Sequence, residues 1–138
     1  MELKSNEEKI TRALLVSVDT GEYDAQASLD ELFELVKSAG ADPVLSVTQN
    51  LQKIEKGTFV GTGKLAEIAE ICESQEIDLL VFDSELSPTQ IKNIEAETDV
   101  RVIDRTTLIL DIFAQRARSK EGKLQVELAQ LKYCLLYT

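Results

Sequence analysis

The sequence contains no histidine and has only two cysteines, Cys72 and Cys134, which stand far apart. A structural zinc site needs closely spaced Cys or His pairs, so such a site is excluded. Acid–base catalysis by histidine and nucleophilic catalysis by a paired Ser or Cys are equally unsupported. Cys72 shares a helical stripe with Leu65 and Ile68, which predicts a buried apolar residue. Cys134 follows a later helical seam, where exposure would permit dimers.

Long apolar runs and aromatic side chains are also scarce. No apolar run approaches the ~18 residues that a membrane span needs, and residues 1–9 lack a signal peptide's apolar core. We therefore expect a cytoplasmic protein without a membrane span. Aromatic residues make up 5% of the chain, so base stacking is not expected to contribute much to any nucleic-acid binding.

The composition is that of one globular domain with an uneven charge. The chain has 138 residues, of which 43% are apolar and 29% charged, enough to bury a core. Residues 1–100 carry 8 basic and 21 acidic side chains, whereas residues 101–138 carry 7 and 4. Phosphate binding needs clustered Lys and Arg, so any RNA contact must be local. The best location is the charge run Arg116, Arg118, Lys120 and Lys123, unless that run is merely solvated.

Predicted strands alternate with predicted helices along the first hundred residues. Apolar runs that suit buried parallel strands occur at 13–18, 43–48, 78–83 and 100–103. Between them, one helix starts with Asp24 or Ser28 as its N-cap and stops at Gly40, and another covers 65–75. Ser87 opens a third helix with a capping box. We expect an α/β fold with a mainly parallel sheet and flanking helices.

Two connecting stretches have weaker signals. The polar stretch 49–56 has no strong periodicity, so we expect a mobile loop there. Residues 58–60 are interpreted as a short additional strand.

The last third of the chain predicts a helical arm. Asp104 is suited to cap a helix in which Leu108, Ile112 and Phe113 share one face. This arrangement leaves Gln115, Arg116 and Arg118 to project outward. After a polar break, leucines recur at coiled-coil spacing at Leu124, Leu128, Leu131 and Leu135. We interpret 1–103 as an α/β domain and 104–138 as the arm.

Three segments resemble HflX-type GTPases, a bacterial family that associates with the large ribosomal subunit. They are FVGTGK at 59–64, DSELSPTQ at 83–90 and DRTTLILDIFAQRARSKEGKLQVELAQLKY at 104–133. The resemblance covers nearly the whole chain and implies the N-terminal domain, with the arm as the first helix of a coiled-coil hairpin. In the family a glycine-rich loop, the returning helix and a GTPase domain that uses GTP and Mg²⁺ follow. The chain thus looks like the front third of such a protein, although residues 135–138 depart from the family's pattern.

The resemblance implies docking onto the large subunit and its rRNA, with the arm reaching toward the peptidyl-transferase region. In the family this docking helps to separate stalled or stressed ribosomes, and the GTPase domain gates the affinity. The RNA-binding candidates are Lys64, Gln115, Arg116, Arg118, Lys120 and Lys123. The natural partner of the leucine stripe would be the returning helix, so without that helix self-association through the stripe is an expected artefact.

The run Gly61-Thr62-Gly63-Lys64 is not a P-loop. That motif needs a glycine five residues before Gly63, but Gly57 lies six before it, and Leu65 replaces the Ser or Thr that binds magnesium. The chain is therefore expected not to be an enzyme. Gly61, Gly63 and Lys64 still form a candidate anion or nucleotide site at a helix start. The alternative is that both glycines only permit a tight turn.

Carboxylates close three predicted strands. Asp19, Asp83 and Asp104 stand at strand ends, and Glu85 follows closely. Such residues gather at one edge of a parallel sheet, where they either build a magnesium or phosphoryl-transfer site or, more often, cap helices. Two other functions thus stay open: an ATP-binding module that uses Lys64 and these carboxylates, and a regulatory brake that packs on the protein's own GTPase domain.

Overall fold

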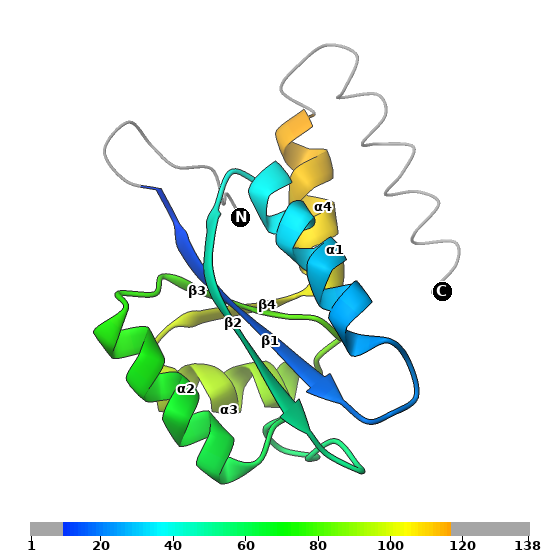
Figure 1. The fold of residues 1–138 in the computed structure, drawn as a ribbon. Helices are drawn as coiled ribbons and strands as arrows, with labels where there is room; N and C mark the ends of the chain where they lie inside the picture. The colour runs from blue at the N-terminus through cyan, green and yellow to red at the C-terminus, as the bar shows by residue number, and fades with distance from the viewer. Residues whose placement is uncertain (1–9, 117–138) are drawn as a thin grey trace.

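The computed structural model describes residues 10–116 as a parallel sheet between two layers of helices (Figure 1). In chain order the elements are β1 (Arg12–Asp19), α1 (Ala25–Ser38), β2 (Asp42–Asn50), α2 (Thr62–Ser74), β3 (Leu79–Phe82), α3 (Pro88–Thr98), β4 (Arg101–Asp104) and α4 (Arg105–Arg116). The strand order is β2-β1-β3-β4, and every neighbouring pair is parallel. Helices α1 and α4 cover one face, and α2 and α3 cover the other. The predicted α/β fold with a mainly parallel sheet is confirmed.

Strand β1 lies inside the sheet and is covered on both faces. Leu14 and Val16 enter the apolar cluster under α2 and α3, whereas Ala13 and Leu15 enter the cluster under α1 and α4. Successive side chains of a strand point to opposite faces, so both core layers need apolar residues from β1. This double coverage explains why the strand reads as a continuous apolar run.

Two predicted helix starts are confirmed at atomic detail, whereas α2 begins at Thr62 and not at the predicted Leu65. Asp24, rather than Ser28, caps α1, because its carboxylate accepts a hydrogen bond from the Ala27 N–H at 3.0 Å. Ser87 and Gln90 form the capping box of α3, in which each side chain accepts from the other residue's backbone N–H.

Asp104 and Gly40 also act as predicted. The Asp104 carboxylate accepts from the Thr107 N–H at 3.0 Å at the start of α4. Gly40 has φ +88°, a conformation that favours glycine, just after the end of α1. The Ala41 N–H then reaches back to the Val36 carbonyl at 3.2 Å, which closes the helix end.

The connection from β2 to α2 differs from the prediction. Residues 49 and 50 belong to β2, so the loop begins at Leu51. Helix α3 holds this loop, since Asn93 Nδ2 donates to the Gly57 carbonyl at 2.9 Å. The predicted strand at 58–60 is reduced to one isolated bridge between Glu55 and Phe59.

Phe59 shows why the local pattern misled. The residue has φ +67°, which no strand adopts, yet its side chain is buried. Its ring packs edge-on against Phe82 with centroids 5.7 Å apart. Burial of the ring therefore compensates for an unfavourable backbone conformation.

Helix α4 packs as part of the helical layer beside α1. Leu108 and Ile112 are buried in the cluster under these two helices. The prediction that Gln115 projects outward is wrong, because its Nε2 donates to the Ala39 carbonyl at 2.8 Å. The leucine stripe falls outside the described residues, and the domain boundary at 104 stays a prediction.

No helix within residues 10–116 combines the length and the apolar character that crossing a membrane requires.

Cys72 is buried against the sheet, as predicted. It is 3% exposed and belongs to the apolar cluster under α2 and α3. This burial disfavours the thiolate and raises the pKa of the thiol from 9.0 to about 11.

Loss of Cys72 should change how stability depends on pH. The raised pKa stabilises the fold fully below pH 9, and this contribution is lost as pH rises toward 11. Between pH 8 and pH 11, the free energy of unfolding of the Cys134→Ala variant should therefore fall by up to about 2 kcal/mol more than that of the Cys72→Ala/Cys134→Ala double variant. Urea denaturation at pH 8 and at pH 11 measures both losses. Equal losses in the two proteins would contradict the burial argument.

Replacing Ser17 should not destabilise the protein. Its side chain is 1% exposed and its Oγ has no hydrogen-bond partner among the described residues. An unsatisfied buried hydroxyl costs about 1–3 kcal/mol, so Ser17→Ala should leave the free energy of unfolding unchanged or raise it by about 1 kcal/mol. Ser87→Ala is the contrasting control, since loss of this cap should cost about 1 kcal/mol in the same urea titration. A clear loss for Ser17→Ala would show that the hydroxyl has a bonding partner.

Candidate functional site

All four helices within residues 10–116 begin at the same edge of the sheet. Each helix follows a strand and runs back over the sheet, so its N-terminus lies where the strands end (Figure 1). Helices α1 and α3, which follow the neighbouring strands β1 and β3, leave this edge on opposite faces, so the sheet has a topological switch point between these two strands. Open α/β sheets usually bind ligands at such an edge. The candidate functional groups are therefore expected here.

The strand-end carboxylates do not combine into one site. Asp104 is buried and accepts from the Leu86 N–H at 3.0 Å in addition to capping α4. Asp83 is paired with Arg105, whose Nη1 lies 2.8 Å from Asp83 Oδ1. Within residues 10–116 no group of three or more Cys, Asp or Glu side chains is placed to hold a metal ion. Asp104 thus serves the helix-capping role that the sequence favoured.

Arg105 also lies at this edge of the sheet, and the sequence did not predict its role. Besides Asp83, its Nη1 contacts the Ser28 hydroxyl at 3.2 Å, and its Nη2 lies 3.5 Å from Glu31. The available signal was its position directly after the strand-end Asp104, where a basic side chain meets the gathered carboxylates. Its partners on α1 have no local signal in the sequence, because they are about 75 residues away along the chain.

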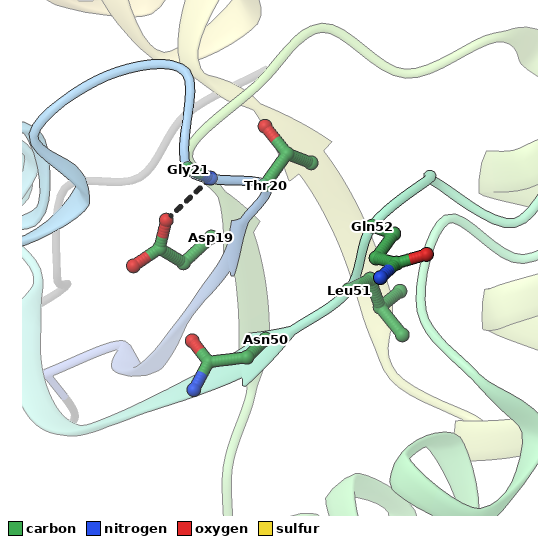
Figure 2. Close-up of a pocket in the computed structure, with 6 residues that line it drawn as sticks. All are labelled: Asp19, Thr20, Gly21, Asn50, Leu51 and Gln52. Carbon is green, nitrogen blue, oxygen red and sulfur yellow. Dashed lines mark hydrogen bonds between the residues drawn. The ribbon is translucent and has the colours of Figure 1, made fainter.

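Asp19 borders a cavity of about 420 Å³ at the ends of β1 and β2 (Figure 2). The cavity is lined by Asp19, Thr20, Gly21, Asn50, Leu51 and Gln52. The Asp19 carboxylate accepts a hydrogen bond from the Gly21 N–H at 2.9 Å. The backbone carbonyl of Asp19 accepts one from the Leu51 N–H at 3.0 Å. The only charged side chain in this lining is a carboxylate, so the cavity does not suit a phosphate.

A second cavity, of about 540 Å³, lies between the ends of α2 and α3 and is strongly acidic. Its lining consists of Ala69, Glu70, Cys72, Glu73, Glu97, Thr98, Asp99 and Val100. Four carboxylates and no basic side chain face this space, so it also repels phosphate.

The start of α2 is the one described helix start without a capping side chain. Gly61 is the N-cap in an extended conformation, with φ −64° and ψ 155°, and no side chain accepts from the first turn. The Gly61 N–H itself donates to Gln49 Oε1 at 2.9 Å. The N–H groups of the first helical residues have no intrahelical acceptor, and together with the helix dipole they favour an anion.

The two glycines are not explained by a tight turn. In the described residues the glycines with positive φ are Gly21 and Gly40, not Gly61 or Gly63. A Cβ at Gly61 would approach Gln49 Nε2 to 3.1 Å, so close packing accounts for this glycine. A Cβ at Gly63 would meet no atom within 4 Å. Gly63 therefore leaves free space directly over the first turn of α2.

Lys64 adds a positive charge beside this space. Its Nζ lies 3.3 Å from Glu67 Oε2, and the two side chains are 21% and 56% exposed. A pair at the protein surface contributes between about 0 and 1 kcal/mol. Lys64 can therefore exchange Glu67 for a phosphate at little cost.

The RNA-binding candidates fall into two separate places. Lys64 lies near the end of β2, because α2 starts beside Gln49, whereas Gln115 contacts Ala39 just before β2 begins. The strand between Asp42 and Gln49 spans ~23 Å, so one phosphate cannot touch both candidates. The other candidates lie at the last residue of α4 or outside the described residues: Arg116, Arg118, Lys120 and Lys123.

Known proteins contain this domain. The family model described as GTP-binding GTPase N-terminal matches residues 26–114. The GTPase HflX of Lacrimispora saccharolytica is 52% identical over 134 residues, covering 96% of this chain and 31% of the relative. The GTPase HflX of Escherichia coli is 46% identical over 122 residues, covering 88% and 29%. The chain thus spans less than a third of the length of these relatives.

Solved structures agree with the sequence relatives. A GTP-binding protein from the archaeon Sulfolobus solfataricus in complex with GDP matches with a TM-score of 0.62 and 30% identity, covering 90% of this chain and 37% of that chain. The SsGBP–GDP complex matches with a TM-score of 0.64 and 30% identity, covering 91% and 36%. Because the family model covers well over half of the chain, the chain belongs to the GTP-binding GTPase N-terminal family of the HflX-type GTPases.

Proposed function

We propose that this chain is the domain with which an HflX-type GTPase docks onto the large ribosomal subunit through rRNA. The observation that carries the proposal is the uncapped start of α2, where the open space at Gly63 adjoins Lys64. The parent protein would act in the cytoplasm on stalled or stressed ribosomes. GTP and Mg²⁺ would belong to its GTPase domain, and this chain would not hydrolyse GTP.

The chemistry of the α2 start suits an RNA phosphate. Free backbone N–H groups donate to phosphate oxygens, the helix dipole favours the negative charge, and Lys64 adds a full positive charge. The missing Cβ at Gly63 lets a phosphate approach the backbone closely. Acidic residues dominate the rest of residues 1–100, so they would confine RNA to this place.

A second contact is proposed at the far end of α4. Arg116 ends this helix, and Arg118, Lys120 and Lys123 continue the basic run. The helix has 12 residues, which corresponds to a length of about 18 Å. Two contacts at opposite ends of the domain would orient it on rRNA better than one contact alone.

The ATP-binding alternative has less support. It needs strand-end carboxylates that are free to bind a ribose or a magnesium ion. Asp104 caps α4 and Asp83 is buried against Arg105, so these two are already engaged. The α2 start by itself supplies a site for a phosphate but nothing that would recognise a nucleoside.

Substituting Lys64 should reduce the salt dependence of ribosome binding. Each lost phosphate contact lowers the slope of log K against log salt by about 0.7–0.9, so Lys64→Ala should lower it by that amount. Replacing Arg116, Arg118, Lys120 and Lys123 by Ala should lower the slope further. Co-sedimentation of the chain with large subunits across a salt series measures these slopes.

Lys92→Ala is the matched control, since Lys92 is an exposed lysine on α3 and its loss should leave the slope unchanged. Absence of binding even at low salt would contradict docking by this chain. The brake hypothesis would then be tested by comparing GTP hydrolysis of the parent protein with and without residues 1–138.

Gly63→Ala should separate folding from function. Alanine has space at this helical position and is the better helix former, so the free energy of unfolding should rise by about 0.5–1 kcal/mol. The added methyl would block close approach of a phosphate, so large-subunit binding should weaken at least threefold. Urea denaturation and co-sedimentation measure the two effects. Unchanged binding by this stabilised variant would exclude the α2 start as the contact.

A further inference from the structure

A polar cluster joins α4 to α1 and β3 at the carboxyl edge of the sheet. Arg105, the first residue of α4, donates from Nη1 to Asp83 Oδ1 at 2.8 Å and to the Ser28 carbonyl at 3.3 Å. Its Nη2 lies 3.5 Å from Glu31 Oε1. One side chain at the start of α4 thus contacts two other elements of the domain.

Arg105 is the cationic partner of Asp83. Its side chain is fully buried at the end of β3, whereas Arg105 is 24% exposed. The second oxygen, Oδ2, has no hydrogen-bond partner among the described residues. The buried Oγ of Ser17 likewise has no hydrogen-bond partner in the part of the chain that the structure describes. Ser17 directly follows Val16, whose carbonyl accepts from the Asp83 N–H. A buried carboxylate with a single cationic partner is strongly destabilised when that partner is removed.

Helix α4 buries fewer apolar residues than α1 does. Of its apolar residues only Leu108 and Ile112 are buried, and at its far end Gln115 donates to the Ala39 carbonyl. Helix α1, by comparison, buries four apolar residues, Ala25, Leu29, Leu32 and Val36. The attachment of α4 therefore depends on a polar contact at its start to a greater extent than that of α1.

We propose that Arg105 is a latch that holds α4 on the domain, and that α4 detaches as a unit when Arg105 leaves Asp83. Detachment would return Asp83, Ser17 and Arg105 to water, and this hydration offsets part of the loss of apolar contacts. The state of the latch would therefore set the orientation of α4 relative to the sheet. This inference does not depend on the proposed RNA contacts.

Hydrogen exchange of the 138-residue chain tests the latch. Arg105→Ala should speed amide exchange of residues 109–116 at least tenfold while amides of β1 and β3 keep their rates. Arg101→Ala, an exposed arginine on β4, removes the same charge and should change neither set. An equal acceleration in α4 and β1, or none in α4, would overturn the proposal.

Two further variants keep the test decisive if Arg105→Ala does not fold. Arg105→Lys keeps the charge but loses the forked donor geometry, so it should speed exchange in α4 by a smaller factor. Asp83→Asn should speed exchange in α4 as well, and Arg105→Lys should add little in that background. If Arg105→Lys and Asp83→Asn had fully additive effects on amide exchange in α4, Asp83 would not be the partner of Arg105 in the latch.

Discussion

The structure depends on a central strand that is buried on both faces. Residues 13–18 of β1 are all buried, and apart from Ser17 they supply apolar side chains alternately to the core under α1 and α4 and to the core under α2 and α3. With β2 and β3 both parallel to β1, each connection must return over one face of the sheet, and helices provide these returns. The double burial of one strand therefore implies the two helical layers.

This arrangement gathers every helix N-terminus at one edge of the sheet. Such termini need acceptors for their free N–H groups, and within residues 10–116 the side chains of Asp24, Ser87 and Asp104 supply them at the starts of α1, α3 and α4. At α2 the N-cap is Gly61, which offers none, and Gly63 leaves space above the first turn. At this edge three helix starts are thus capped by side chains, whereas the start of α2 remains free to bind an anion. That difference, rather than a cavity, supports the proposed rRNA contact.

Polar burial at the same edge has another consequence. Asp83 and Asp104 are both buried strand-end carboxylates, but their environments differ. Asp104 accepts backbone N–H groups from two segments, so its charge is stabilised by fixed parts of the fold. Asp83 relies on the side chain of Arg105, and its Oδ2 has no hydrogen-bond partner within residues 10–116. The first carboxylate stabilises the fold, whereas the second makes the attachment of α4 conditional on one side chain.

Local signals made much of this fold predictable. Apolar runs located the strands, and the capping residues Ser87 and Asp104 located two helix starts to the residue, because capping acts within three positions of the chain. The end of β2 and the conformation of Phe59 were missed. Both depend on partners distant in sequence: β1 pairs with residues 49 and 50, and Phe82 packs on the ring of Phe59. Long-range pairing of this kind leaves no periodic signal.

By itself, the sequence determined the class of fold, the burial of Cys72 and the presence of glycines and a lysine at a helix start, since composition and short-range pattern control these features. Only the tertiary structure decided which of these residues act together. It separated Lys64 from Gln115, joined Arg105 to Asp83 and Ser28, and left Gly63 open. Contacts between elements far apart in the chain arise from packing, and packing is settled only when the whole sheet and its helices are assembled.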